Sequence, residues 1–219
     1  MIKLVIFDLD GTLLNTIADL AASTNHALEQ YKFPTHPTEA YRFFVGNGIN
    51  KLFERALPEG EKTDINIQRI RTSFLPYYNT HNMDRSTPYP GITDVLQELQ
   101  QQGLLLAVAS NKYHEATCKL VAHYFPEIRF AKVLGQREGI APKPDPVIVQ
   151  EILSVTAVTQ EETLYVGDSG VDMQTAINSG VVSCGVSWGF RPLHELENFQ
   201  PDYIIHKAEE IVRIVSSHA

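Results

Sequence analysis

Short runs of β-branched or aliphatic residues recur along the chain and are followed at once by small or polar residues. Each run is continuously apolar rather than alternating, which is typical of strands in a parallel sheet that is covered on both faces. The pattern predicts six such strands, which are Lys3–Phe7, Leu104–Ala109, Ala131–Leu134, Thr163–Val166, Val181–Val186 and Tyr203–Ile205.

Segments with a helical period of apolar residues lie between these strands. The segment Ile92–Gln102 is an example, because it places Val95 and Leu99 on one face and is followed by Gly103 as a C-terminal stop. The same period predicts helices at Tyr113–His123, Pro146–Leu153, Val171–Asn178 and Lys207–Val215. Strand and helix therefore alternate from Pro90 onward, which indicates an α/β fold with a doubly wound, mostly parallel sheet.

One segment interrupts this alternation. Between about residues 16 and 85 the pattern predicts only helices, which are Asp19–Gln30, Thr38–Val45, Asn50–Leu57 and Thr63–Thr80. We therefore expect an α/β core of residues 1–15 and 86–219 and an all-helical cap of residues 16–85. An insert directly after the first strand lies over the carboxyl ends of the strands, where ligands bind in such sheets. The cap must open and close, and we expect hinges near Asn15–Thr16 and Arg85–Pro88.

Composition narrows the classes of function. The formal net charge of −8 at pH 7, without any basic run, argues against a nucleic-acid partner. An anionic substrate then needs a local source of positive charge. The N-terminus lacks the features of a signal peptide, and no apolar run approaches the roughly 18 residues that span a membrane. We expect a cytoplasmic protein without a membrane partner.

Four segments bring small polar or charged residues to the carboxyl edge of the predicted sheet. They supply Asp8, Asp10, Gly11 and Thr12 after the first strand, Ser110 and Asn111 after the second, Lys143 before a helix, and Asp168 and Asp172 after the fourth strand. Two carboxylates at ~4 Å repel by about 4 kcal/mol at an effective dielectric constant of 20. Lys143 alone does not neutralise Asp8, Asp10 and Asp168, whereas a hard divalent ion does, and Mg²⁺ suits such oxygen ligands.

The same residues suit phosphoryl transfer. Asp8, at the end of the first strand, is placed to attack phosphorus and form an aspartyl-phosphate. Asp10 lies two residues further on, on the same side, where it is placed to protonate the leaving oxygen and then to activate water. The groups expected to bind the phosphoryl oxygens are the backbone amides near Gly11, Thr12 and Asn111, the Ser110 hydroxyl and the Lys143 ammonium group.

Each of these residues also has a simpler structural interpretation. Asp8 with Asp10 is compatible with a turn after a strand, and Ser110 with Asn111 is compatible with a helix N-cap. Lys143 is compatible with a surface lysine before a proline-rich turn. Asp172 is compatible with a favourable acid in the first turn of a helix, and this interpretation ranks close to the functional one.

Four segments, in this order and context, resemble the four motifs of the haloacid dehalogenase superfamily phosphohydrolases. They are Asp-Leu-Asp-Gly-Thr, Ser-Asn, Lys-Pro-Asp-Pro and Gly-Asp-Ser-Gly-Val-Asp. The helical insert is similar to the C1-type cap of that family. The resemblance implies that Asp8 is the nucleophile and Asp10 the general acid and base, and that Ser110 and Lys143 bind the phosphoryl group. The implied metal ligands are the Asp8 carboxylate, the Asp10 backbone carbonyl, Asp168, and Asp172 either through water or as an orienting group.

The first motif narrows the reaction within that family. A dehalogenase of this fold uses neither a second acid nor a metal, so Asp10 argues against dehalogenation. A β-phosphoglucomutase usually has an aliphatic residue after its Asp-Gly pair, whereas Thr12 follows Gly11 here, which favours hydrolysis of a phosphate monoester. Inorganic pyrophosphatase and β-phosphoglucomutase remain alternatives. A non-catalytic binding domain is a further alternative, against which the presence of both Asp8 and Asp10 argues.

The predicted cap contains a Gly46-Asn47-Gly48 turn before a helix, whose N-terminal amides are an anion site, and Lys51 lies nearby. We expect this loop to bind the anionic end of a small substrate, with an ordinary helix–helix turn as the alternative. Together with Pro90-Gly91 and Trp188–Arg191, the loop resembles the phosphoglycolate phosphatase branch of the family. The resemblance implies a Mg²⁺-dependent phosphatase for a small phosphorylated metabolite such as 2-phosphoglycolate, and we expect a monomer or a homodimer.

Overall fold

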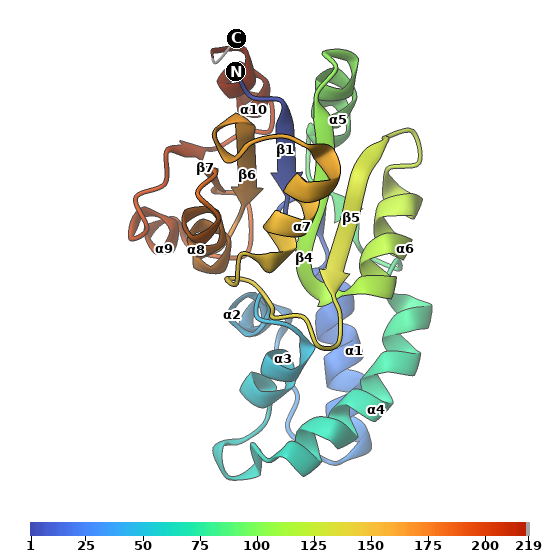
Figure 1. Cartoon of the computed structure of the whole chain (residues 1–219). Helices are drawn as coiled ribbons and strands as arrows, with labels where there is room; N and C mark the ends of the chain where they lie inside the picture. The colour runs from blue at the N-terminus through green and yellow to red at the C-terminus, as the bar shows by residue number, and fades with distance from the viewer. Residues whose placement is uncertain (218–219) are drawn as a thin grey trace.

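Figure 1 shows the protein as a computed structural model, which describes residues 1–217. Within this range, six parallel strands form one sheet in the spatial order β5-β4-β1-β6-β7-β8. The strands are β1 (Leu4–Phe7), β4 (Leu105–Tyr113), β5 (Phe130–Gln136), β6 (Thr163–Gly167), β7 (Val182–Val186) and β8 (Tyr203–Ile205). The predicted α/β fold with a parallel sheet is confirmed.

β1 is the central strand, and it pairs with β4 on one side and with β6 on the other. The chain builds one half of the sheet from β1 through β4 and β5, and then builds the other half through β6, β7 and β8. The strand order therefore reverses between β1 and β6. In open α/β sheets, ligands bind at the carboxyl ends of the strands beside such a reversal.

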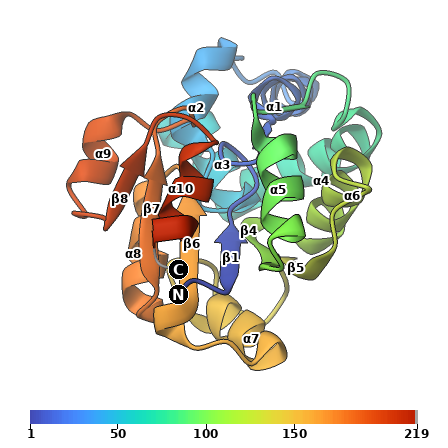
Figure 2. The same ribbon diagram turned by 90° about the horizontal axis from the view of Figure 1, so that it is seen from above.

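The side chains of the sheet alternate between two apolar cores, one on each face. The larger helices around the sheet are α5 (Ile92–Gln101), α6 (His114–Tyr124), α7 (Val147–Thr156), α8 (Gly170–Ser179) and α10 (Glu210–Ser217) (Figure 2). In β1, Val5 and Phe7 belong to the core that contains residues of α5, α6 and α10. Leu4 and Ile6 belong to the core that contains residues of α7 and α8. Both sets are buried because helices cover both faces, which explains the continuous apolar run.

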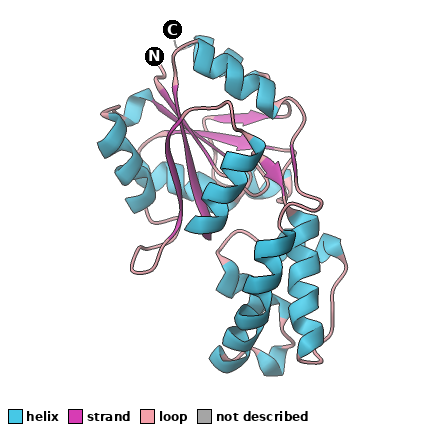
Figure 3. Cartoon of the chain, turned by 90° about the vertical axis from the view of Figure 1, so that its right-hand side faces the viewer, coloured by secondary structure: helices cyan, strands magenta, loops and turns pink. Residues whose placement is uncertain are grey.

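The helices between residues 17 and 81 form a separate lobe at the carboxyl edge of the sheet (Figure 3). They are α1 (Ile17–Gln30), α2 (Tyr41–Phe44), α3 (Ile49–Ala56) and α4 (Asp64–His81), with 3₁₀ turns at Thr38–Ala40 and Glu59–Glu61. The lobe has its own apolar core, in which the rings of Phe53, Phe74 and Tyr78 contact one another in sequence. Among the described residues, no helix is both long and apolar enough to cross a membrane.

Some elements differ from the expectation. β4 continues through Ser110 and Asn111 to Tyr113, because its pairing with β5 resumes after an irregularity, so α6 begins only at His114. The N-cap interpretation of Ser110 and Asn111 is therefore wrong. The predicted helix Thr38–Val45 divides into a 3₁₀ turn and α2. The sequence pattern also missed short elements, which are β2 (Leu14–Asn15), β3 (Thr87–Pro88), a 3₁₀ turn at Gln160–Glu162 and α9 (Leu193–Glu197).

The two connections between the sheet and the helical lobe lie side by side. β2 and β3 pair antiparallel. Asp19 in α1 is buried, and its carboxylate accepts hydrogen bonds from the backbone N–H of Arg85 at 3.1 Å and of Ser86 at 2.8 Å. The Ser86 hydroxyl donates to the same carboxylate at 2.7 Å. One buried carboxylate thus joins the first turn of the lobe to the segment by which the chain leaves it.

The variant Asp19→Asn should lower the free energy of unfolding by about 2–3 kcal/mol, because buried donors lose a charged acceptor. Urea unfolding followed by circular dichroism measures this change. The matched control is Glu29→Gln at the exposed end of the same helix, for which we expect a change below about 0.5 kcal/mol. Equal stability of the two variants would show that the carboxylate does not hold the connection.

Candidate active site

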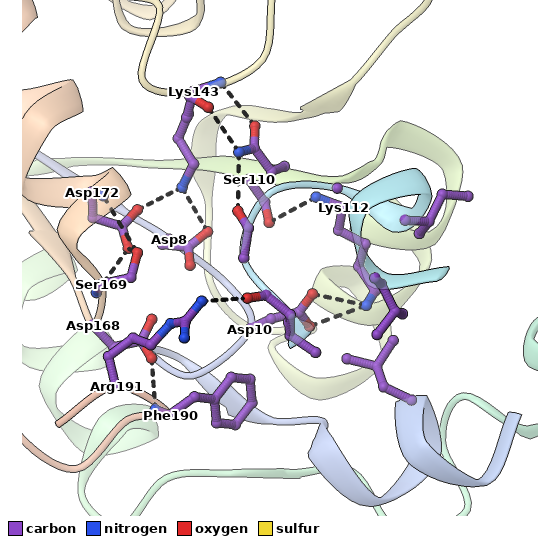
Figure 4. Close-up of a pocket in the computed structure, with 17 residues that line it drawn as sticks. Asp8, Asp10, Ser110, Lys112, Lys143, Asp168, Ser169, Asp172, Phe190 and Arg191 are labelled. Carbon is purple, nitrogen blue, oxygen red and sulfur yellow. Dashed lines mark hydrogen bonds and ion pairs between the residues drawn. The ribbon is translucent and has the colours of Figure 1, made fainter. Parts of the chain in front are cut away.

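A pocket lies where the carboxyl ends of β1, β4 and β6 face the helical lobe (Figure 4). Apolar side chains of the lobe, including Leu20, Ile49 and Leu52, form part of its wall. Most of the site residues that the sequence predicts line this pocket. They are Asp8, Asp10, Ser110, Asn111, Lys143, Asp168 and Asp172 from the core, and Gly46 and Gly48 from the lobe. The predicted residues that lie outside its lining are Gly11, Thr12, Asn47 and Lys51.

Asp8 follows β1 directly, and its Oδ1 accepts a hydrogen bond from Lys143 Nζ at 2.9 Å. Asp172 Oδ1 at 2.7 Å, the Ala109 carbonyl at 2.9 Å and the Tyr165 hydroxyl oxygen at 3.0 Å are also within hydrogen-bond distance of this ammonium group, so its three N–H donors are shared among four acceptors. Burial by itself would lower the pKa of Lys143, but Asp172 and Asp8 together raise it well above its usual range. The lysine is therefore a charged group that joins two of the carboxylates.

Asp172 lies in the first turn of α8, which begins at Gly170, shortly after β6 ends at Gly167. Ser169 is the N-cap residue, and its side chain and that of Asp172 form a reciprocal capping box. Asp172 Oδ2 accepts hydrogen bonds from the Ser169 hydroxyl at 2.6 Å and from the Ser169 N–H at 3.1 Å. Its Oδ1 faces Lys143. The two interpretations of Asp172 that the sequence left open are therefore compatible.

Two glycines allow the backbone to approach Asp168 closely. A Cβ atom at Gly11, where φ is +96°, would lie 2.3 Å from Asp168 Oδ2, and a Cβ atom at Gly189 would lie 2.2 Å from Asp168 Cβ. Neither position accepts a side chain unless Asp168 moves. The N–H of Phe190 donates to Asp168 Oδ2 at 2.6 Å. Gly11 therefore lies against Asp168 and supports its position.

Asp8, Asp168 and Asp172 place carboxylate oxygens within 4.8 Å of one another, and all three residues are buried. Burial raises the pKa of Asp8 to about 7, with Lys143 opposing the rise and the charge of Asp172 adding to it. Burial, together with the charges of Asp172 and Asp8, raises the pKa of Asp168 well above its usual range. The protein alone therefore disfavours the fully charged cluster, and its all-oxygen donor set fits a hard divalent cation.

A second buried lysine, Lys112, lines the pocket and was missed in the sequence analysis. Its Nζ donates to both carboxylate oxygens of Asp10, at 3.1 Å and 2.9 Å, and the Thr16 hydroxyl donates to Asp10 Oδ1 at 2.7 Å. The ammonium group also lies 4.8 Å from the centroid of the Tyr78 ring in α4. Strand alternation would have revealed it, because Ser110 and Lys112 are two residues apart in an extended segment.

Asn111 connects three segments at the pocket. Its Oδ1 accepts a hydrogen bond from the Lys143 N–H at 2.8 Å, and its Nδ2 donates to the Lys143 carbonyl at 3.1 Å. The same Nδ2 donates to the Gly46 carbonyl in the lobe at 3.1 Å. The neighbouring Ser110 is buried, and its hydroxyl oxygen accepts a hydrogen bond from the Lys112 N–H at 3.3 Å. Asn111 therefore positions both the Lys143 segment and the lobe against β4.

The lobe contributes only part of the predicted substrate loop. Gly46 and Gly48 line the pocket, with φ values of +117° and +81° that favour glycine. Asn47 instead accepts a hydrogen bond from Arg55 Nη2 at 2.7 Å through its side-chain oxygen. The Lys51 side chain is 55% exposed and forms an ion pair with the acidic residue three positions further along α3. The loop backbone faces the pocket, whereas these polar side chains do not.

Comparison with known proteins places this site in a family. A sequence model described as haloacid dehalogenase-like hydrolase matches residues 5–186. The chain belongs to the haloacid dehalogenase-like hydrolase family. It is 30% identical over 219 residues to the phosphoglycolate phosphatase of Mannheimia succiniciproducens. The alignment covers 97% of this chain and 98% of the relative. It is also 30% identical over 223 residues to the phosphoglycolate phosphatase of Vibrio parahaemolyticus. That alignment covers 100% of this chain and 98% of the relative.

Similar solved structures support the same family assignment. A suggested phosphoglycolate phosphatase from Lactobacillus delbrueckii subsp. bulgaricus superimposes with a TM-score of 0.91 at 34% identity, covering 97% of this chain and 98% of the other. One from Haemophilus somnus superimposes with a TM-score of 0.90 at 29% identity, covering 97% of each chain. The protein is therefore a phosphatase, a hydrolase of phosphoric monoesters, as the motifs predicted.

In the absence of divalent ions, the thermal midpoint of unfolding should fall as the pH rises toward 7. The folded protein keeps a proton on Asp8 up to about pH 7, whereas the unfolded chain releases it near pH 3.8. The free energy of unfolding therefore decreases across this window. Calorimetry in EDTA between about pH 5 and pH 7 measures the slope.

Two controls separate this effect from the titration of other groups. Asp8→Asn should reduce the slope, because the variant has no carboxyl group to titrate at this position. Excess Mg²⁺ should reduce it in the unmodified protein, because a bound cation favours the charged carboxylate. Equal slopes for the variant and the unmodified protein in EDTA would contradict the assignment to Asp8.

Proposed function

We propose that the protein is a Mg²⁺-dependent phosphatase that hydrolyses a small phosphate monoester, 2-phosphoglycolate, through an aspartyl-phosphate on Asp8. The observation that carries the proposal is the position of Asp8 directly after the central strand. There it is hydrogen-bonded to Lys143 and lies within 4.8 Å of oxygens of Asp168 and Asp172. A carboxylate fixed beside a cation and a metal-type donor set is suited to nucleophilic attack on phosphorus.

The proposed reaction has two steps, each of which balances. In the first, an oxygen of Asp8 forms a bond to phosphorus while the bond from phosphorus to the leaving oxygen breaks, and protonated Asp10 gives its proton to that oxygen. In the second, the Asp10 carboxylate accepts a proton from water as the water oxygen attacks phosphorus. The bond between phosphorus and Asp8 then breaks, phosphate leaves, and both carboxyl groups return to their starting states.

Charge balance supports a divalent cofactor in this proposal. Four carboxylates at the strand ends face two buried lysines, Lys112 and Lys143, which leaves two negative charges there when all four acids are ionised. The third cation of the pocket lining, Arg191, makes no hydrogen bond to these carboxylates. Mg²⁺ would supply the positive charge that stabilises the transferring phosphoryl group. The proposed ligands are the Asp8 carboxylate, the Asp10 carbonyl, Asp168 and Asp172. The Ser110 hydroxyl, the Asn111 backbone and Lys143 would bind the phosphoryl oxygens.

The choice of 2-phosphoglycolate rests on the names of the relatives and on the pocket wall. Curated relatives that align over almost the whole chain are phosphoglycolate phosphatases. The lobe covers the strand ends with aliphatic side chains, including Leu20, Ile49 and Leu52, and with the backbone of Gly46 and Gly48, which leaves room for a short substrate. The proposal includes a cap of residues 16–85 that moves on hinges near β2 and β3 to admit the substrate and exclude water.

Phosphate release should be fastest with 2-phosphoglycolate in a panel that also contains pyrophosphate, glucose 1-phosphates and p-nitrophenyl phosphate. EDTA should abolish release, and added Mg²⁺ should restore it. Asp8→Asn should lower kcat by about 10³-fold or more, because the nucleophile is removed. Circular dichroism checks that the variant remains folded.

The outcomes of this assay are distinct. Release from p-nitrophenyl phosphate alone would keep the mechanism and reject the substrate. Preference for pyrophosphate, or return of the phosphoryl group to the sugar, would indicate the pyrophosphatase or mutase alternative. Full activity of a folded Asp8→Asn variant would reject the nucleophile, and no release from any compound would favour a non-catalytic domain.

Lys112→Met should lower kcat by about 10²-fold, because Asp10 loses both charge-assisted hydrogen bonds that orient it for proton transfer. Lys112→Arg keeps the charge and should recover part of the loss. The readout is kcat with p-nitrophenyl phosphate, accompanied by the thermal midpoint of each variant. Lys207→Met, at an exposed position, is the matched control. A Lys112→Met variant as active as this control would exclude an orienting role for the lysine.

A further inference from the structure

Arg191 is the third cation among the residues that line the pocket, after Lys112 and Lys143. It lies between β7 and α9, and its side chain extends toward the lobe (Figure 4). Its Nη2 donates a hydrogen bond to the Val45 carbonyl at 3.0 Å, and the side chain is only 12% exposed. Unlike the two lysines, Arg191 makes no hydrogen bond to a carboxylate within residues 1–217.

The guanidinium group of Arg191 keeps unused donors. Its Nε forms an ion pair with Glu195 Oε1 at 3.8 Å, which is beyond hydrogen-bond distance, and that oxygen accepts a hydrogen bond from the Gly170 N–H at 2.9 Å. Within the described residues, Nη1 makes no hydrogen bond. The group also lies 5.9 Å from the centroid of the Phe43 ring. Because a largely buried cation with unused N–H donors favours an acceptor, an anion in the pocket would complete its surroundings.

The position of Arg191 is tied to the strand-end carboxylates. The preceding residue, Phe190, donates its N–H to Asp168 Oδ2 at 2.6 Å, so the segment is fixed against the proposed metal ligand. On the side of the lobe, a Cβ atom at Gly46 would lie 3.8 Å from Arg191 Nη2. The absence of a side chain at Gly46 leaves space beside the guanidinium group. A short substrate with its phosphorus at Asp8 therefore has a fixed cation within the same pocket.

The other cations near the lobe loop are engaged elsewhere. Lys51 is exposed and paired, and Arg55 donates to the carbonyls of Phe43 at 3.3 Å and Phe44 at 3.0 Å. Burial lowers the pKa of Arg55, and the positive charge of Arg191 lowers it further, so the two guanidinium groups are close enough to repel. An anion bound at Arg191 would reduce this repulsion.

We propose that Arg191 binds the carboxylate of the substrate and selects phosphate monoesters in which a carboxylate lies close to the phosphate. The inference rests on the proposed function and assigns the anionic end of the substrate to a core residue rather than to Lys51. Arginine suits this role because its planar guanidinium group can donate two parallel hydrogen bonds to a carboxylate.

The test compares two substrates that differ only at the anionic end. In 2-hydroxyethyl phosphate, a hydroxymethyl group replaces the carboxylate of 2-phosphoglycolate. In Arg191→Met, the ratio of kcat/KM for 2-phosphoglycolate to kcat/KM for 2-hydroxyethyl phosphate should fall by about 10-fold to 100-fold, the range expected for lost hydrogen bonds to a charged group. Arg191→Lys keeps the charge without the fork and should lose less.

Arg42→Met is the matched control, because it removes the same charge from an exposed position of the lobe, and its ratio should equal that of the unmodified protein. The thermal midpoint of each variant checks folding, and Arg191→Lys provides the same comparison where Arg191→Met does not fold. An unchanged ratio in a folded Arg191 variant would overturn the inference. A ratio that falls in Lys51→Met instead would also overturn it.

Failure of the proposed function gives a different result. If the unmodified protein hydrolysed both compounds equally well, the substrate class would be wrong before any variant was measured, and with it the carboxylate site. If it released phosphate from neither compound, the substrate assignment itself would fail. A preference for 2-phosphoglycolate that persists in Arg191→Met would keep the proposed function and reject only the role of Arg191.

Discussion

Mutual repulsion among carboxylates at the carboxyl ends of β1 and β6 is the constraint on which the site depends. Asp8 and Asp10 follow β1, and a second acidic pair follows β6, which is its neighbour where the strand order reverses. The raised pKa of Asp8 reflects the cost of bringing these groups together away from water. Lys112 and Lys143 are buried among them and offset half of the charge. The negative charge that remains explains why an oxygen-lined site at this edge of the sheet fits a divalent cation.

The residues that surround the pocket also join the sheet to the helical lobe. Lys112 lies against the Tyr78 ring, Asn111 donates to the Gly46 carbonyl, and Arg191 donates to the carbonyl of Val45. A movement of the lobe away from the sheet would break these contacts and expose polar groups that they satisfy. Where the chain enters and leaves the lobe, the Asp19 carboxylate joins α1 to the backbone of Arg85 and Ser86. In the proposed closure of the lobe over the strand ends, these contacts would form together with the site.

The strand-end acids were predictable from the sequence because parallel strands share one edge, so residues far apart in the chain converge there. The sequence does not mark Lys112 as a pocket residue, because the apolar run that predicts the strand ends at Ala109, whereas pairing with β5 continues to Tyr113. Lys51 was expected in the pocket because it lies close to the glycine turn in the chain. Instead, Ile49 and Leu52 lie on the face of α3 that lines the pocket. Because successive residues of a helix are about 100° apart, Lys51 lies on another face.

The positive charge that attracts substrate must be local, because the chain as a whole carries a formal charge of −8. With a divalent ion bound, the strand-end carboxylates and the two buried lysines would sum to about zero. A phosphate monoester with a neutral tail would then enter a site with little remaining charge except that of Arg191. A substrate with a carboxylate gains from that charge, and the gain is larger in a largely buried pocket than in water. Phosphoryl chemistry and substrate choice would therefore depend on different cations, with Lys143 serving the first and Arg191 the second.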